Sequence, residues 1–349
     1  MICFVCSNLW PYSFGGAERR YYEFALELMR RGHEVRYVTY SWGPSDIPVV
    51  SIGPPPRLYD AEGRRRLVPA ILFALAIRRA VVKARCRVID ASVPYTEVFF
   101  LPPEITVLTL HEFWGRRWGE YFGPLLGRFV EWAEQRLVLR PRVVIAPSRL
   151  TAERVRRLRR DVRVIPFGLR LEEYLSYRTA EKEFDVAIIS RLVPYKGVVE
   201  ALKALSLVKR RLKVVVVGEG PLRERVKREA ERGRHAISLL PSASEKEKRM
   251  ILARSLYYLN LSPAEGFSIA TLEAAALGAY PVILNSRDNA AVELIEALRY
   301  GAAVSTPAEA AAVIEAGDVP EPPTAPLYQF HITKAVDHYE RVIKEIYDS

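Results

Sequence analysis

The chain has 349 residues, half of them apolar and about a quarter charged, as in a globular protein with room for two domains. Three cysteines are too few for a disulfide framework, and no apolar run approaches the ~20 residues that cross a bilayer. Residues 1–167 carry 27 Lys and Arg against 16 Asp and Glu, whereas residues 168–349 carry 25 of each, so we expect an anionic partner for the first half.

Short β-rich runs alternate with helical patterns along the chain, which indicates parallel α/β layers. In the first half we expect strands at 2–7, 35–40, 49–52, 88–90, 106–110, 143–146 and 162–166. The main helices between them are expected at 17–31, 67–84, 121–139 and 150–159. A second series of strands is expected at 185–190, 213–217, 237–240, 257–260, 281–284 and 302–304, each followed by helix-compatible sequence.

Two segments divide these series. Residues 166–183 are polar and lack a strand pattern, so we interpret them as an interdomain linker, and a Pro-rich stretch at 319–326 precedes an amphipathic helix at 331–347. The expected fold is α/β, with two doubly wound Rossmann-like domains at 1–167 and 168–330. Ligands of such sheets bind at the carboxyl ends of the strands, so the cleft between the domains is the expected site.

The N-terminal segment has no basic region ahead of its first apolar run, so we expect no signal peptide and a cytoplasmic location. Cys3 and Cys6 are spaced as C-x-x-C, but on a strand residues i and i+3 point to opposite faces. We interpret them as two core cysteines rather than a redox or metal site. Asn, Gln and Met are scarce while Arg is abundant, which indicates a hyperthermophilic source.

Glycine turns follow two of the expected strands. Gly15 and Gly16 precede the first helix, where backbone amides and a helix N-terminus favour an anion; a glycine turn without a ligand is the alternative. Gly218 and Gly220 also precede a helix, but the third glycine and the downstream acid of a dinucleotide fingerprint are missing. NAD binding is therefore not predicted.

His111 closes the expected strand 106–110, where it could hydrogen-bond a substrate hydroxyl; an ordinary buried histidine is the alternative. The zinc motif H-E-x-x-H is not met, because Gly115 stands where the second His belongs. The sequence contains no Asp-x-Asp, so we expect no carboxylate-held metal.

Arg191 and Lys196 lie at a strand–loop–helix junction, where a guanidinium fork and an ammonium can clamp a diphosphate. Gly197 permits a tight approach into the following helix. The spacing differs from that of a Walker A loop, and solvated surface cations are the alternative.

The run at 262–278, SPAEGFSIATLEAAALG, follows a strand and opens a helix near Ser268, which we expect to act as its N-cap. The helix start suits hydroxyls and anions. Glu265 lies just ahead of this start and Glu273 about one turn inside, so one carboxylate could hold a sugar and the other a ribose. A capped surface helix with two solvated acids is the alternative.

Together these motifs resemble the GT-B retaining glycosyltransferases of family 4, over nearly the whole chain and in the family's order. The matching segments are GGAE, His111, PSRLTAERV, VIPFG, RLVPYKG, GEGP and EGFSIATLE followed by AAALGAYPV. The most specific feature is the Glu–seven residues–Glu spacing, which Glu265 and Glu273 meet at the expected distance after RLVPYKG.

The resemblance implies a role for each matching residue. Glu273 would bind the ribose, Glu265 a hydroxyl of the transferred sugar, and Arg191 with Lys196 the diphosphate. It implies four catalytic residues, His111, Arg191, Lys196 and Glu265. It implies donor-binding residues at Gly15, Gly16, Gly218, Gly220, Gly266, Phe267, Ser268 and Glu273. It also implies a metal-independent reaction without cofactor, an acceptor on the N-terminal domain, and a last helix (331–349) that packs back on that domain.

Three departures from the family pattern occur. Its usual Asn-Gly-x-Asp is here Phe167-Gly168-Leu169-Arg170, Ser190 replaces a frequent glycine before Arg-Leu, and the turn before Glu293 lacks glycine. None removes a residue expected to hold the diphosphate or the donor hydroxyls.

The predicted function is transfer of a hexose-type sugar from a UDP- or GDP-sugar to a glycan, lipid-linked or small-molecule acceptor. With both Glu residues assigned to hydroxyls, we favour a same-face route over double displacement. The alternatives are a nucleotide-sugar epimerase or a phosphorylase on the same architecture, and a degenerate sugar- or nucleic-acid-binding protein. No RNP, KH or zinc-finger motif appears, so no nucleic-acid partner is expected.

The basic half contains two apolar, arginine-bearing segments, at 64–85 and 116–132. They suggest contact with an anionic lipid leaflet or a lipid-phosphate acceptor. Helices buried on a parallel sheet read equally apolar, so this alternative stays open.

Overall fold

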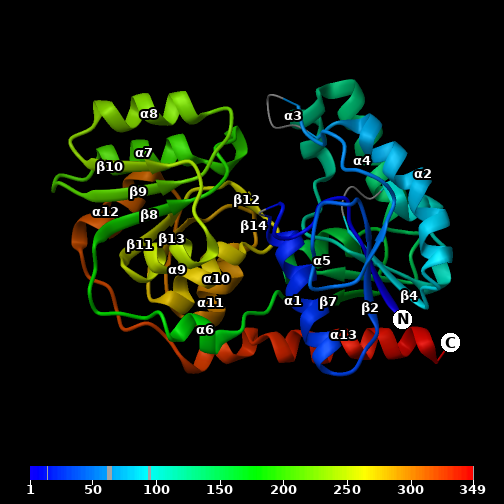
Figure 1. Cartoon of the computed structure of the whole chain (residues 1–349). Helices are drawn as coiled ribbons and strands as arrows, with labels where there is room; N and C mark the ends of the chain where they lie inside the picture. The colour runs from blue at the N-terminus through cyan, green and yellow to red at the C-terminus, as the bar shows by residue number, and fades with distance from the viewer. Residues whose placement is uncertain (14, 61–64, 93–95, 349) are drawn as a thin grey trace. The chain divides into compact units, whose positions relative to one another are not determined.

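The computed structural model describes residues 1–13, 15–60, 65–92 and 96–348, and the chain divides into two compact units (Figure 1). Unit 1 comprises Met1–Gly168 and Ile332–Ser349, and unit 2 comprises Leu169–His331. Phe14 and Arg64, which fall in segments discussed above, lie outside the described residues. In the described part of the chain, no helix combines the length and apolarity needed to cross a bilayer.

Unit 1 is built on a seven-stranded sheet in the order β3-β2-β1-β4-β5-β6-β7, and all its pairings are parallel. The strands are β1 (Ile2–Val5), β2 (Val35–Thr39), β3 (Val49–Ser51), β4 (Val88–Ala91), β5 (Thr106–Thr109), β6 (Val143–Ala146) and β7 (Val162–Val164). Each lies within a few residues of a strand predicted from the apolar runs.

Helices cover both faces of this sheet. The helices of unit 1 are α1 (Gly16–Arg30), α2 (Leu67–Lys83), α3 (Trp118–Phe122), α4 (Pro124–Leu137), α5 (Arg149–Arg156) and α13 (Ile332–Tyr347). Because successive strand residues point to opposite faces, Ile2 and Phe4 pack with α1 and α13. Cys3 and Val5 face the other side, where the core includes α2, α5 and the end of α4.

The single helix predicted at 121–139 is wrong, since α3 and α4 divide this segment. Gly123 has a φ of 84°, which L side chains rarely adopt, and Pro124 starts the next helix at the position where proline is favoured. The two helices also approach closely, because a Cβ on Gly127 would lie 2.4 Å from the Cα of Gly119.

The interpretation of Cys3 and Cys6 as core cysteines is confirmed, since both are buried, but a disulfide at Cys3 was not predicted. Cys3 on β1 forms a disulfide with Cys86, which lies between α2 and β4, whereas Cys6 is free and buried. The two bonded residues are 83 positions apart in sequence, so the local spacing that drew attention to Cys6 could not identify the partner.

Unit 2 repeats the doubly wound plan with a six-stranded parallel sheet in the order β10-β9-β8-β11-β13-β15. The strands are β8 (Phe184–Ile189), β9 (Lys213–Val217), β10 (Ala236–Leu240), β11 (Ser255–Asn260), β13 (Tyr280–Leu284) and β15 (Ala302–Val304). The α-helices are α6 (Leu171–Leu175), α7 (Val198–Ser206), α8 (Arg223–Arg232), α9 (Glu245–Ala253), α10 (Ile269–Leu277), α11 (Ala291–Leu298) and α12 (Pro307–Ala316).

Two features of unit 2 were not predicted. The segment interpreted as a linker contains α6, and a separate two-residue ladder joins β12 (Ala264–Glu265) to β14 (Asp288–Asn289). The ladder ties the loop after β11 to the loop after β13, which fixes the position of Glu265.

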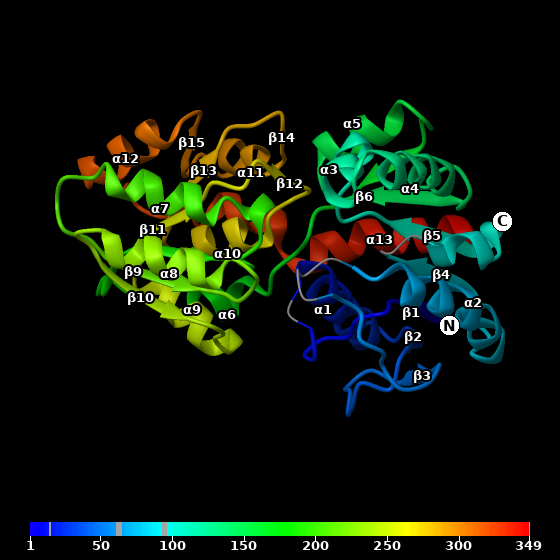
Figure 2. The same ribbon diagram turned by 90° about the horizontal axis from the view of Figure 1, so that it is seen from above.

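The last helix, α13, follows unit 2 in sequence but belongs to unit 1. It lies beside α1 on the unit 1 sheet (Figures 1 and 2). The Tyr339 ring contacts Phe24 at 5.6 Å, and Arg31 donates to Asp337 and Glu340 at 2.6 Å each. The structure thus confirms the predicted fold class, two doubly wound domains with a last helix that returns to the first.

Candidate functional site

In unit 2, the loops that follow β8 and β11 carry most of the predicted donor residues. The β8 loop turns through η4 (Pro194–Lys196) into Gly197, whose φ is 63°. A Cβ on Gly197 would lie 2.1 Å from the carbonyl oxygen of Leu261, so only glycine lets the two loops touch here. This close approach brings Lys196 to the β11 loop.

Lys196 and Glu265 form an ion pair, with Nζ 2.7 Å from Oε1 and side chains that are 19 % and 13 % exposed. Asn260, at the end of β11, donates through Nδ2 to Glu265 Oε1 at 3.5 Å and to Ser268 Oγ at 3.4 Å. Its Oδ1 accepts the Ser262 N–H at 3.0 Å, which holds the amide in place. The Glu265 carboxylate is therefore fixed by two partners on different loops.

The second acid, Glu273, lies in the second turn of α10 and accepts a hydrogen bond from the Tyr174 hydroxyl at 2.9 Å. Tyr174 comes from α6, in the segment expected to be a linker. Burial raises the pKa of Tyr258 well above its usual value, and the nearby charges of Glu265 and Glu273 raise it further. Both carboxylates thus lie close enough to Tyr258 to share one region of unit 2.

The start of α10 differs from the expected N-cap. Ser268 makes no side-chain cap, and its backbone lies in the left-handed region with a φ of 70°. Its hydroxyl instead pairs with Thr271 Oγ1 at 2.9 Å. A non-glycine residue in this region is strained by roughly 1–2 kcal/mol, as at many functional sites. Beside it, Gly266 and Phe267 are buried, and the Phe267 ring contacts Phe330 at 6.2 Å.

The remaining predicted donor residues of unit 2 lie near Lys196. Arg191 is exposed, and its guanidinium lies 5.7 Å from the centre of the Tyr195 ring, which Lys196 also approaches at 6.0 Å. Gly218 and Gly220 contact this loop through backbone, since their Cβ atoms would lie 1.8 Å and 2.5 Å from the carbonyl oxygens of Ser190 and Leu192. These glycines support the Arg191 loop, and their contact with a donor stays a prediction.

In unit 1, Gly15 and Gly16 lie at the start of α1 as expected, but an acid occupies the space beside them. A Cβ on Gly15 would lie 2.0 Å from the Glu18 carboxylate, which also accepts from Asn8 Nδ2 at 3.0 Å. An anion that approached this helix start would meet that carboxylate, and contact of Gly15 and Gly16 with a donor stays a prediction.

His111 follows β5 at its carboxyl end. Both ring nitrogens are buried, and neither has a hydrogen-bond partner among the described residues. The ring contacts Tyr21 at 5.9 Å and Phe167 at 5.8 Å. Burial lowers the pKa of His111 to about 3, with a further contribution from the charge of Arg20. The imidazole is therefore neutral at physiological pH, and its contact with a substrate hydroxyl stays a prediction.

Sequence reasoning missed two buried ionisable side chains in this region, Arg20 and Asp90. The Arg20 guanidinium is 2 % exposed, stacks 4.0 Å from the Phe24 ring, and has no hydrogen-bond partner in the described part of the chain. Asp90 on β4 accepts from the Tyr21 hydroxyl at 2.8 Å and from Thr109 Oγ1 at 2.9 Å. The helical pattern did not indicate that Arg20 is buried, because two consecutive arginines in GGAERR are typical of a solvated helix surface.

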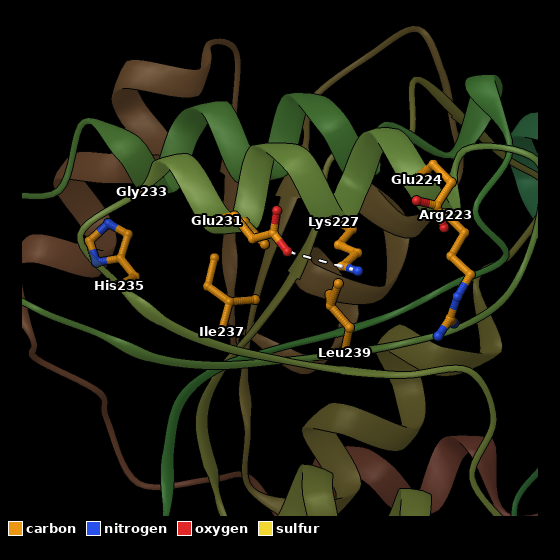
Figure 3. Close-up of a pocket in the computed structure, with 9 residues that line it drawn as sticks. Arg223, Glu224, Lys227, Glu231, Gly233, His235, Ile237 and Leu239 are labelled. Carbon is orange, nitrogen blue, oxygen red and sulfur yellow. Dashed lines mark ion pairs between the residues drawn. The ribbon is translucent and has the colours of Figure 1, made fainter.

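A surface groove lies between α8 and β10 (Figure 3). Lys227 and Glu231 face each other along it with 4.0 Å between Nζ and Oε1. The groove contains none of the predicted site residues, and its neutralised charges give no reason to place the donor there.

The sequence matches two family descriptions, arranged one after the other. Residues 14–173 match Glycosyltransferase Family 4 and residues 172–316 match Glycosyl transferases group 1. The chain belongs to the family 4 glycosyltransferases. Among relatives of this glycosyltransferase, the O-antigen chain mannosyltransferase C of Escherichia coli is 26% identical over 297 residues, which is 78% of this chain and 76% of the relative.

Solved structures share the fold of this family 4 glycosyltransferase at low identity. The sucrose-phosphate synthase of Thermosynechococcus elongatus superposes with a TM-score of 0.80 at 14% identity over 99% of both chains. The Anabaena protein HepE, solved in complex with UDP and glucose, gives 0.72 at 16% identity over 98% of this chain and 99% of its own. These structures confirm the predicted fold, and the two family matches confirm the resemblance to family 4 glycosyltransferases.

Proposed function

We propose that this glycosyltransferase moves a hexose-type sugar from a UDP- or GDP-sugar to a glycan, lipid-linked or small-molecule acceptor, with retention and without a metal. The observation that carries the proposal is the Glu265 carboxylate held by Lys196 and Asn260 beside Glu273. Glu265 suits a hydroxyl of the sugar, Lys196 suits the diphosphate, and Glu273 suits the ribose of such a donor.

Glu265 accepts hydrogen bonds from a hydroxyl of the transferred sugar, and Glu273, oriented by Tyr174, accepts from the ribose. The backbone amides of Gly266, Phe267 and Ser268 approach the sugar at the start of α10. Charge-assisted hydrogen bonds to carboxylates are shorter and stronger than neutral ones, so they select a donor rich in vicinal hydroxyls.

Lys196 and Arg191 stabilise the leaving diphosphate. An ammonium has three N–H donors, so Lys196 can keep its bond to Glu265 while it donates to a phosphate oxygen. Fixed cations aimed at the oxygens where charge develops lower the barrier without reorganisation during the reaction.

Retention follows from a same-face displacement. The bond between the anomeric carbon and the phosphate oxygen breaks, the acceptor oxygen bonds the same face of that carbon, and the departing phosphate takes the acceptor proton. Neutral His111 contributes a hydrogen bond to an outer sugar hydroxyl, since the low pKa of its ring rules out proton donation near neutral pH.

The relatives guide the choice of donor. The Escherichia coli relative is a mannosyltransferase, and HepE was solved with UDP and glucose, so GDP-mannose and UDP-glucose are the first donors to test. We propose a cytoplasmic location in a hyperthermophile. The Cys3–Cys86 disulfide is compatible with this location, because disulfides persist in the intracellular proteins of hyperthermophiles.

The decisive experiment incubates the purified protein with GDP-mannose, UDP-glucose or ADP-glucose and a panel of glycan, lipid-linked and simple glycoside acceptors, in the presence and absence of EDTA. We expect donor-dependent release of a nucleoside diphosphate that EDTA does not reduce, and a product whose anomeric NMR coupling matches that of the donor. Lys196→Ala should lower the rate ~10²–10³-fold, whereas Lys203→Ala, on the exposed side of α7, should not. Nucleotide binding without turnover of any donor would favour a sugar-binding protein instead.

A further inference from the structure

The outward side of α2 is apolar where a soluble helix is normally polar. Large apolar residues fill its exposed positions in the first half of the helix: Leu67, Val68, Ile71, Leu72 and Leu75. Arg78, Arg79 and Lys83 continue the same exposed stripe in the second half. No acidic residue occurs in α2. The buried side, with Phe73 and Ile77, packs on the sheet, so the exposed stripe is additional to what the core requires.

Helix α4 repeats this arrangement. Leu125 is 86 % exposed and Phe129 62 %, and Trp132 stacks beside Phe129 with 5.9 Å between ring centres. Arg136 lies 5.8 Å from the centre of the Trp132 ring. Glu134, one of the two acids in α4, is buried and bonded to the loop after His111, so it does not neutralise the outward side.

Both helices contact the same side of unit 1. They share one core with β1 and β4, and η1 (Thr96–Phe100) contacts both. Phe100 on η1 is exposed, and Arg140, beyond the end of α4, lies 5.8 Å from the Phe99 ring centre. We name the exposed parts of α2, η1 and α4 the α2–α4 face; Figure 1 labels both helices.

Exposed apolar side chains gather in this part of the chain rather than being spread evenly over the described residues. Of the seventeen large apolar side chains exposed in the described residues, twelve lie between residues 67 and 139. The outward side of α8, RERVKREAER, is polar by comparison. An exposed apolar area with a basic margin marks an interaction surface.

We propose that the α2–α4 face docks on the surface of an anionic lipid bilayer. The leucines, Phe129 and Trp132 enter the boundary between headgroups and acyl chains, while Arg78, Arg79, Lys83 and Arg128 contact lipid phosphates. A second copy of the chain fits less well, because a symmetric contact would bring these cations against their own equivalents. The inference concerns unit 1 and does not depend on the proposed sugar transfer.

The test is sedimentation of the full chain with vesicles of phosphatidylcholine containing about one third phosphatidylglycerol, at low and moderate salt. We expect binding that weakens as salt rises, and little binding to pure phosphatidylcholine. Arg78→Gln combined with Arg79→Gln should weaken binding ~10- to 30-fold, on the basis of the contribution of each basic residue near a charged membrane.

Matched variants distinguish binding through the α2–α4 face from nonspecific binding through any exposed apolar residue. Leu72→Ser with Phe129→Ser should also weaken binding, whereas Leu207→Ser, at a 56 % exposed leucine of unit 2, should not. Thermal unfolding of each variant checks that it folds. Equal binding to neutral vesicles, no binding at either salt, or equal loss in Leu207→Ser would overturn the proposal. A concentration-dependent dimer abolished by the Leu72→Ser and Phe129→Ser pair would assign the face to self-association instead.

Discussion

Glu265 has more partners than a surface carboxylate normally has, so its orientation is fixed before a substrate binds. Its partners come from two loops, with Lys196 on the β8 loop and Asn260 at the end of β11. The backbone carbonyl of Glu265 also accepts the Ala290 N–H at 2.8 Å, which adds a third loop. Such a carboxylate is oriented in advance, so little reorganisation is needed when a sugar hydroxyl arrives.

We therefore expect Glu265→Gln to bind nucleotide but to lose most transfer, with a rate ~10²–10³-fold below that of the wild type. The amide keeps the shape of the side chain but removes the charge that pairs with Lys196 and accepts from the donor. Nucleotide-dependent thermal shifts measure binding, and nucleoside diphosphate release measures turnover. Glu200→Gln, at an exposed acid of α7, is the control. Wild-type turnover of a verified donor by Glu265→Gln would remove Glu265 from the mechanism.

The sequence predicted residues of the candidate site that lie at strand ends but not the partners that hold them. Lys196 and Glu265 follow expected strands, so their motifs were visible. Tyr174 is 99 residues from Glu273 in sequence, so only tertiary folding brings the two together, whereas Asn260 lies five residues before Glu265 at the end of an expected strand but was not singled out. The positions of the asparagines could have indicated Asn260. The chain has only four, and each of them follows a strand, ends a strand or lies in β14.

Helix α4 connects to the His111 loop through one buried acid. Glu134 accepts the Trp114 N–H at 3.1 Å and the Gly115 N–H at 2.7 Å, three to four residues after His111. Burial raises the pKa of Glu134 to about 7, and the two backbone donors only partly oppose this. The loop is thus tied to a group that changes charge near neutral pH.

The sign of the resulting pH effect follows from linkage. Between its ordinary pKa of 4.5 and about 7, Glu134 keeps its proton in the folded chain but loses it on unfolding. Its contribution to stability should therefore fall by about 3 kcal/mol as pH rises through this window, and stay constant above it. Urea unfolding at several pH values should show this fall for the wild type relative to Glu134→Gln. Glu131→Gln, on the same helix, keeps Glu134 and should show the same fall as the wild type; identical profiles for wild type and Glu134→Gln would contradict the assignment.

Secondary structure was predictable where apolar runs are long and continuous. Buried parallel strands such as β6 (VVIA) and β9 (KVVVV) consist mostly of Val and Ile, and the structure begins and ends them where predicted. Short elements carry no such pattern. The β12–β14 ladder has two residues per strand and α6 has five, so tertiary contacts rather than propensity define them. Gly123-Pro124 indicates the break between α3 and α4, but the apolar pattern continues across it and favours a single helix.

The disulfide constrains the whole of the first half of unit 1. Cys3–Cys86 closes a loop that includes α1, β2, β3 and α2. We expect its loss to lower the free energy of unfolding by ~2–4 kcal/mol, mainly through a less constrained unfolded chain. Urea unfolding of Cys86→Ala against the wild type measures this, and Cys6→Ala is the control. Thiol counting on the denatured, unreduced protein should find one thiol; three would show that the disulfide does not form.

The chain passes from unit 1 to unit 2 and returns, so the stability of unit 1 depends on the last residues of the sequence. Tyr339 on α13 is fully buried, with its ring 6.1 Å from Phe4 and 5.6 Å from Phe24. Arg31 and His33 bind Asp337 and Glu340 at the surface of the same contact. Surface ion pairs contribute little, so the buried ring dominates the attachment of α13.

Tyr339→Ala should therefore destabilise unit 1 by about 3–5 kcal/mol, the usual loss for a buried aromatic side chain. Hydrogen exchange should show faster exchange in β1 and α1, while β8 and β11 of unit 2 keep their protection. Tyr339→Phe retains the ring and should cost much less. Nucleotide binding by unit 2 should survive Tyr339→Ala, because Lys196 pairs with Glu265 and Tyr174 donates to Glu273, both within unit 2. Equal loss of protection in both units would show instead that they unfold as one, and that α13 stabilises the entire chain.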